Sequence, residues 1–262
     1  MALQQQEQQA PLGFFGGAKI FFQGFGFIVG RPSMWPLAAV PMLVALVLTV
    51  LLAWLGIASA RAAVDSLFGQ PSNAWGEIGA WLTRALLYVL AVVAAVLAGS
   101  ALAQPISGPA LDRIARAQEL ALGVPPRAET STSFLVSVGR ALRVTLVTLA
   151  IGAPILILLT IVELLVPPAA VVTLPLKFLV SALLATWDLV DYVFGLRDTS
   201  VRDRWAWYRQ NLGACLGFGA FVALVALVPL VGLMMLPVGV AGATRLVVTS
   251  GTQPHALPRR TG

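Results

Sequence analysis

The stretch Gly30-Arg31-Pro32-Ser33 combines three features that could hold an anion at the start of a helix. Free backbone N–H groups and the dipole at a helix N-terminus attract negative charge. Gly30 would let an anion approach the backbone closely, and Ser33 is a natural N-cap. Arg31 could add charge-assisted hydrogen bonds in a forked arrangement, which suits a tetrahedral oxyanion. The alternative is that Arg31 only anchors the following apolar run at a membrane surface.

Four acidic or basic residues further along the chain lie within apolar sequence. Glu163 and Lys177 could form an intramembrane site, with each other or a water-filled cavity as partner. Exposure of Glu163 at a turn and snorkelling of Lys177 are the alternatives. Asp188 and Asp191 share a helical face and could bind a coupling ion. Alternatively, they belong to a structural ion-pair network with the arginines of the next loop, which are Arg197, Arg202, Arg204 and Arg209.

The common catalytic motifs are missing from the sequence, which has no GxxxxGK[ST] loop, HExxH or GxSxG. His255 is the only histidine and lies in a polar tail, where a solvated side chain is expected. Cys215 is the only cysteine and lies in an apolar run, which is typical of a buried thiol. We therefore expect no enzymatic activity, no metal or cofactor, and no nucleic-acid partner.

The elements that must position these residues are membrane helices. Of the 262 residues, 58% are apolar and only 11% are charged, which is far outside the range of soluble domains. The composition predicts an all-α integral membrane protein embedded in a lipid bilayer. We expect a disordered start over residues 1–12, and then an interfacial amphipathic helix over 13–30 with phenylalanines on one face and Lys19 and Gln23 on the other.

Two long uncharged runs predict transmembrane helices over residues 35–60 and 78–104. The segment 105–139 is more polar and has an apolar stripe, so we expect it on the cytoplasmic side, resting on the membrane surface. A flexible tail is expected over 250–262. Together with the remaining apolar sequence, these segments form a single membrane domain.

Two more apolar regions, 142–192 and 212–248, are each divided by proline. Each is either a pair of short spans or a re-entrant hairpin, since arms of about 17 to 20 residues are marginal for a full crossing. The second region turns near Pro229, Gly232 and Pro237, and lacks the polar residues of a turn that emerges into water. This pattern favours re-entrant hairpins.

The basic residues all fall on one side of the membrane if the spans and hairpins pair up. The positive-inside rule makes that side cytoplasmic and places both termini there. These residues are Lys19, Arg31, Arg113, Arg116, Arg127, Arg140, Arg143, Arg197, Arg202, Arg204, Arg209, Arg245, Arg259 and Arg260.

Several short stretches carry a resemblance to a known family. They are Gly30-Arg31-Pro32-Ser33-Met34-Trp35-Pro36, Gln104-Pro105 with LDRIARAQELALG, Trp187-Asp188-Leu-Val-Asp191-Tyr192 ahead of Arg197, and Asn211-Leu-Gly213-Ala-Cys-Leu-Gly217-Phe218-Gly219. Pro237 and Ala241-Gly242-Ala243-Thr244 follow in the same order. Over residues 13–248 the chain resembles the CysZ-type sulfate transport proteins and the wider etoposide-induced membrane protein family.

The resemblance implies a bacterial inner-membrane protein with two long spans, two hemi-penetrating helical pairs and homo-oligomeric assembly. It also implies passage of sulfate towards the cytoplasm. Candidates to bind sulfate or a related oxyanion are Gly30, Arg31, Ser33 and Arg197, and candidates for a pathway or for ion coupling are Glu163, Lys177, Asp188 and Asp191. We expect ATP-independent transport. The alternative is a membrane scaffold or assembly factor that transports nothing.

Overall fold

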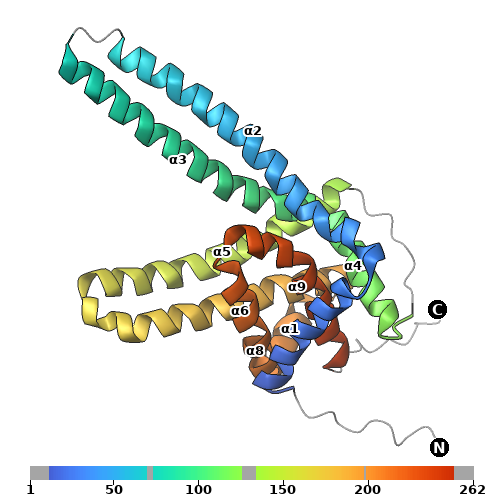
Figure 1. Cartoon of the computed structure of the whole chain (residues 1–262). Helices are drawn as coiled ribbons and strands as arrows, with labels where there is room; N and C mark the ends of the chain where they lie inside the picture. The colour runs from blue at the N-terminus through green and yellow to red at the C-terminus, as the bar shows by residue number, and fades with distance from the viewer. Residues whose placement is uncertain (1–11, 70–72, 126–133, 198, 251–262) are drawn as a thin grey trace, which may run out of the picture. The chain divides into compact units, whose positions relative to one another are not determined.

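The computed structural model describes residues 12–69, 73–125, 134–197 and 199–250, and contains helices and no strands in these ranges (Figure 1). The all-α prediction is confirmed for them. The predicted disordered start at 1–12, apart from Leu12, and the predicted tail at 250–262, apart from Ser250, lie outside the described residues. The elements are α1 (Phe14–Val29), η1 (Pro32–Met34), α2 (Trp35–Phe68), α3 (Ala74–Ile106), α4 (Gly108–Ala121), α5 (Phe134–Leu165), η2 (Pro167–Ala169), α6 (Ala170–Leu196), α7 (Val201–Gln210), α8 (Leu212–Ala226) and α9 (Pro229–Thr249).

Four helical segments are long and apolar enough to cross a membrane. They are Pro32–Leu67, Ala74–Ala103, Thr148–Leu165 and Pro167–Leu196, and α7 with α8, bent by 89°, could make a fifth. These lengths and compositions support the prediction of an integral membrane protein. The arms of the first proline-divided region are longer than expected, since α5 has 32 residues and α6 has 27.

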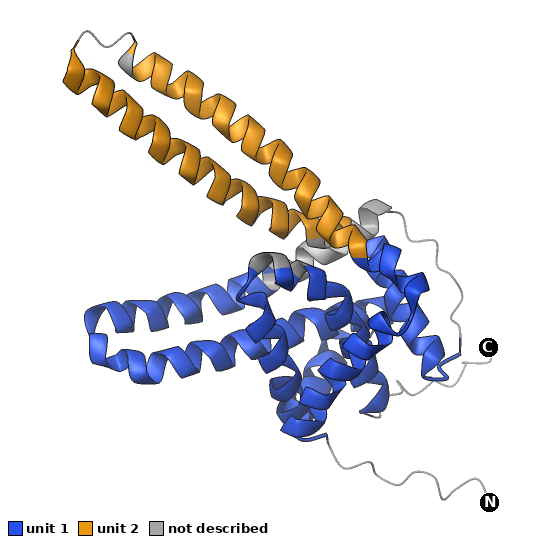
Figure 2. Cartoon of the chain, in the orientation of Figure 1, with its two compact units in different colours: residues 1–38, 108–262 blue, residues 39–107 orange. Residues whose placement is uncertain are grey.

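The chain folds into two compact units, Met1–Ala38 with Gly108–Gly262 and Ala39–Ser107, which Figure 2 colours separately. The second unit is an antiparallel hairpin of α2 and α3. Small residues bring its helices together: a Cβ added to Gly56 would lie 2.9 Å from the Cβ of Ala91, and one on Gly99 would lie 2.5 Å from Oγ1 of Thr49. At the turn, the side chain of Asn73 accepts a hydrogen bond of 2.7 Å from the Gly76 N–H and caps α3.

In the first unit, α1 packs against α8 and α9 through glycines. A Cβ added to Gly17 would lie 1.9 Å from the Ala214 carbonyl oxygen, and one on Gly24 would lie 2.7 Å from the backbone nitrogen of Gly242. No side chain fits at either position, so the helices are in backbone contact. Gly17 and Gly24 therefore lie on the packing face of α1 with Ile20 and Phe21, while Phe15 and Phe22 are exposed.

Helix α4 buries the apolar stripe that was expected to rest on the membrane surface. Leu111, Ile114 and Ala115 belong to the hydrophobic core of the first unit, which also contains residues of α6 and α9. Neighbouring helices therefore cover this stripe, and the position of segment 105–139 on the membrane surface stays a prediction. The polar face of α4 carries Asp112 and Glu119, which contact residues at the end of α6.

The predicted turns of the two proline-divided regions lie close to where the structure has them. Helix α5 ends at Leu165, and η2 at Pro167–Ala169 leads into α6. Helix α8 ends at Ala226, and Pro229 occupies the first turn of α9, where its missing N–H costs nothing. Gly232 and Pro237 lie inside α9 rather than at the turn. Both tips are apolar and are exposed in the isolated chain, with Val171 80% and Leu227 73% exposed.

Candidate functional site

A buried ion pair joins α4 to the end of α6. Arg197 follows the last residue of α6 and donates from Nε and Nη2 to Oε1 of Glu119, at 2.9 and 2.7 Å. The side chain of Arg197 is only 5% exposed, and that of Glu119 is 14% exposed. An unpaired arginine at this position would carry a large desolvation cost, so the carboxylate is what allows the charge to be buried.

A second ion pair joins α6 to α7. Ser200 caps α7 by accepting a hydrogen bond from the Asp203 N–H, which fixes the direction in which this helix leaves the loop. Nη1 of Arg204 donates to Oδ1 of Asp191 at 2.8 Å, and its Nε donates to the Thr199 carbonyl oxygen at 2.8 Å. Asp191 is thus part of an ion-pair network, which is one of the two alternatives predicted for it.

A tyrosine completes the contacts between α4 and α6. The hydroxyl of Tyr192 lies 2.9 Å from the Gly108 carbonyl oxygen and also contacts the carboxylate of Asp112. Asp112 and Glu119 are seven residues apart on α4, so both project from the same face of the helix. The first turn and the last turn of α4 are therefore each tied to the C-terminal part of α6. We call Asp112, Glu119, Asp191, Tyr192, Arg197 and Arg204 the polar network.

Gln118 lies next to this network in the sequence and is completely buried. Neither Oε1 nor Nε2 of its amide has a hydrogen-bond partner among the described residues. A buried amide without partners costs about 1–3 kcal/mol, so such groups usually bind water or a ligand. Gln118 therefore adds an unsatisfied donor and acceptor to α4 beside Glu119.

The predicted anion site at Gly30, Arg31 and Ser33 has a different geometry from the one expected. The prediction that Ser33 caps the helix is wrong, because Arg31 occupies the N-cap position and Ser33 lies within η1. Gly30 ends α1, and its N–H donates to the Gly26 carbonyl oxygen at 2.9 Å. The N–H of Arg31 donates to the Ile28 carbonyl oxygen at 3.3 Å. Two backbone donors that an anion could have used are therefore occupied, because α1 continues up to this point.

The side chain of Arg31 is nevertheless exposed. Its guanidinium lies 4.1 Å from the centre of the Phe27 ring. Because the ring contacts the flat face of the guanidinium, the N–H groups at its edge can still donate to a ligand. Arg31 and Arg197 thus occupy different environments, one exposed and stacked on a ring, the other buried and paired with a carboxylate.

The remaining candidates lie along the α5–α6 hairpin. Glu163 and Lys177 form an ion pair near its turn, with side chains 28% and 21% exposed. Asp188 accepts a hydrogen bond of 2.8 Å from Oγ1 of Thr148 and links the two helices nearer to the other end. Lys177 and Asp188 are separated by about 16 Å along α6, so these residues do not converge on one site.

Sequence reasoning grouped Asp191 with the arginines but missed the acidic partner of Arg197. Glu119 was not among the candidate residues, because it lies in the amphipathic segment 105–139. Two features of the sequence could have indicated that α4 has a buried polar face. They are the seven-residue spacing of Asp112 and Glu119, and the position of Gln118. Gln118 falls at the i+7 position of the stripe that begins at Leu111, where a polar residue is unexpected.

The family described as Sulfate transporter CysZ/Etoposide-induced protein 2.4 matches residues 20–237. No curated protein matches the chain. The matched residues include α2 to α8, and with them both ion pairs of the polar network. Because the match extends over most of the 262 residues, the chain belongs to the CysZ and etoposide-induced protein 2.4 family.

Proposed function

We propose that this protein takes up sulfate or a related oxyanion across the bacterial inner membrane without ATP, as a homo-oligomer with both termini in the cytoplasm. Membership of the family supports a membrane transport function, and the apolar helices support a multi-pass location. The observation that carries the choice of an oxyanion is the buried Arg197, which is held by one oxygen of Glu119.

A sulfate ion and a carboxylate offer the same kind of acceptor to a guanidinium. An anion that reaches Arg197 could therefore replace Glu119 without leaving the buried positive charge uncompensated. Gln118 would add a donor from the neighbouring position on α4. Such an exchange makes Glu119 a competitor for the anion, and the strength of the Arg197–Glu119 pair then sets how readily the anion binds.

Arg31 would meet the anion at the cytoplasmic surface. Its exposure on the Phe27 ring suits transient contact, whereas burial of Arg197 suits selection among anions. Gly30 and Ser33 keep a role in this proposal as neighbours that allow close approach. Glu163, Lys177 and Asp188 remain candidates for a pathway or for ion coupling, and Asp191 is the candidate that already contacts an arginine.

For the membrane arrangement, we propose that α2 and α3 cross completely and that the other two hairpins are re-entrant. Asp65 and Glu77 flank the turn of α2–α3, whereas the turn residues of both other hairpins are apolar, and the Glu163–Lys177 ion pair near the turn of α5–α6 carries no net charge. Helix α8 has 15 residues and extends only about 22 Å, less than the roughly 30 Å of the hydrocarbon core.

A non-transporting scaffold is the second candidate. One observation favours it: Arg197 and Arg204 both already have carboxylate partners, as expected for a network that only holds helices together. The two functions differ in the effect of Glu119→Gln, which removes a charge but keeps the shape of the side chain. If Arg197 binds the anion, this variant binds sulfate more tightly. If the pair is only structural, the variant is less stable and its sulfate binding is unchanged.

The main experiment measures radiolabelled sulfate binding and uptake into proteoliposomes, with empty liposomes as control and selenate, phosphate and chloride as competitors. Arg31→Ala should weaken sulfate binding about 10- to 100-fold, the effect of losing one charged hydrogen bond of about 1.5–3 kcal/mol. Arg31→Lys should recover part of the loss, because lysine keeps the charge but not the planar fork.

Lys19→Ala is the matched control, since Lys19 is also an exposed cation and lies on α1. It should leave sulfate binding unchanged. Selenate should compete well, and chloride, which is too small to span the same donors, should not. Unchanged sulfate affinity in correctly inserted Arg31→Ala and Glu119→Gln proteins would contradict the proposal and favour the scaffold.

A further inference from the structure

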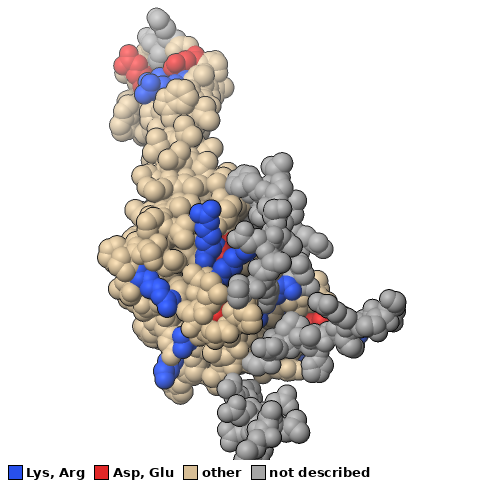
Figure 3. Space-filling model, turned by 90° about the vertical axis from the view of Figure 1, so that its right-hand side faces the viewer, with Lys and Arg blue, Asp and Glu red and all other residues tan. Residues whose placement is uncertain are grey.

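We propose that the turn end of the α2–α3 hairpin binds a phospholipid whose headgroup carries both a phosphate and a primary ammonium. The first observation is the distribution of charge in this unit. Residues 39–107 contain four charged side chains, and all four lie towards the turn: Arg61, Asp65, Glu77 and Arg84. Figure 3 shows acidic and basic atoms gathered at this end of the hairpin, at the top of the view.

Exposed tryptophans indicate the depth of this end in the bilayer. Trp75 and Trp81 lie in the first turns of α3 and are 83% and 65% exposed. Tryptophan concentrates at the boundary between hydrocarbon and headgroups. Helix α2, with 34 residues, is about 51 Å long, so it extends beyond a hydrocarbon core of roughly 30 Å. The charged end therefore lies at the level of the lipid headgroups.

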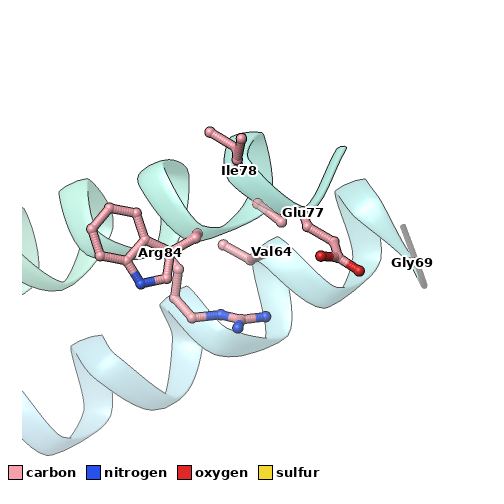
Figure 4. Close-up of a pocket in the computed structure, with 7 residues that line it drawn as sticks. Val64, Gly69, Glu77, Ile78 and Arg84 are labelled. Carbon is pink, nitrogen blue, oxygen red and sulfur yellow. The ribbon is translucent and has the colours of Figure 1, made fainter. Parts of the chain in front are cut away.

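A pocket of about 510 Å³ opens between the helices at this level. It is lined by Val64, Gly69, Glu77, Ile78, Ala80, Trp81 and Arg84, and its volume is within the range of small-ligand sites. Figure 4 shows the Arg84 and Glu77 side chains both extending from α3 towards α2. The pocket thus presents one basic and one acidic group above an apolar floor, which matches a zwitterion attached to acyl chains.

The charges select among headgroups. Arg84 donates to Asp65 at 3.0 Å, but both side chains are well exposed, at 42% and 67%, so this pair is weak and a lipid phosphate could replace the carboxylate. Glu77, the acidic residue that lines the pocket, then accepts hydrogen bonds from the ammonium. Arg61 donates to the Tyr88 hydroxyl and does not line the pocket.

This set of groups disfavours the other common headgroups. A headgroup with only a negative charge would meet the Glu77 carboxylate as well as Arg84. A quaternary ammonium has no N–H to donate and could only contact the face of Trp81. A phosphoethanolamine headgroup satisfies both signs of charge, and Val64, Ile78 and Ala80 would contact the start of its acyl chains.

The test is native mass spectrometry of the full-length protein with phosphatidylethanolamine, phosphatidylcholine and phosphatidylglycerol of identical acyl chains. The wild type should bind phosphatidylethanolamine about three- to tenfold more tightly than the other two. Glu77→Gln should lower phosphatidylethanolamine binding to the level of phosphatidylcholine. Arg84→Gln should weaken the binding of both, because both carry the phosphate.

Arg61→Gln is the matched control, since it removes a cation from the same end of the hairpin without changing the pocket, and it should keep the lipid preference. Equal binding of the three lipids by the wild type would overturn the proposal. A preference for phosphatidylglycerol would also overturn it, because the end would then act as a simple basic patch. A preference that survives in both Glu77→Gln and Arg84→Gln would place the lipid elsewhere.

Discussion

The α2–α3 and α5–α6 hairpins are both built from long apolar helices, yet they end in opposite ways. Charged residues flank the turn of α2–α3, with Asp65 and Glu77 closest to it, and Asn73 caps the helix that follows. The turn of α5–α6 consists of leucine, valine, proline and alanine, and its exposed residues include Leu164 and Val171. A turn that reaches water needs polar groups, whereas a turn that stays in lipid cannot tolerate them. Residue type at the turn, more than helix length, therefore supports the proposal that α2–α3 crosses the membrane and that α5–α6 is re-entrant.

The two hairpins also differ in how they hold charge. Asp65 and Arg84 are exposed, and water can satisfy either one alone. Glu163 and Lys177 are less exposed and lie among apolar side chains, so each depends on the other. An ion pair is therefore expected to contribute little to the stability of α2–α3 and much to the stability of α5–α6. These differences between the two hairpins predict different access from outside the cell, different effects of removing a charge and different effects of changing a cap.

The largest difference concerns access from outside the cell. In a Cys215→Ala background, Ser66→Cys in α2–α3 should react almost completely with an impermeant thiol reagent added to intact cells. Val171→Cys in α5–α6 should react only after detergent is added, although its side chain is 80% exposed in the isolated chain. Labelling measured by gel shift separates the two outcomes. Reaction of Val171→Cys in intact cells would show that α5–α6 also crosses the membrane.

The second prediction compares the two ion pairs. Glu163→Gln should lower the free energy of unfolding by about 3–5 kcal/mol, because it leaves Lys177 uncompensated in apolar surroundings. Asp65→Asn should cost about 0–1 kcal/mol, because Arg84 remains hydrated. Denaturant unfolding in the same lipid or detergent measures both.

A double variant controls for this interpretation. Glu163→Gln combined with Lys177→Met removes both charges and should recover most of the stability. Equal losses for Glu163→Gln and Asp65→Asn would refute the idea that the two turns differ in environment.

The smallest effect concerns the caps. Asn73→Ala should destabilise α3 by about 1 kcal/mol through loss of its hydrogen bond to the Gly76 N–H, and Asn73→Gly should cost only a few tenths. Val166 precedes η2 and makes no side-chain cap bond, so Val166→Ala should change stability by less than about 0.5 kcal/mol. Thermal unfolding monitored by circular dichroism compares the three variants. A larger loss for Val166→Ala than for Asn73→Ala would mean that the apolar turn makes contacts that the single chain does not contain.

The sequence by itself determined the protein class, the helical content and the positions of the turns. Lipid requires the backbone to satisfy its own hydrogen bonds, so long apolar runs form helices, and Pro167, Pro168 and Pro229 show where those helices are interrupted. These properties depend on local sequence. The resemblance to the CysZ family also came from short local stretches, and the family match confirms it.

Only the tertiary structure decided which residues meet. Arg197 and Glu119 are 78 residues apart, and no spacing rule connects them. Residues 13–30 were expected to form an interfacial amphipathic helix, yet Gly24 lets the backbone of α1 approach Gly242 of α9. A helix with several small residues has several possible packing faces, and the one used depends on the shape of its partner. The same holds for charge, because a buried carboxylate is assigned to an arginine by the packing of α4, α6 and α7, and not by its position in the chain.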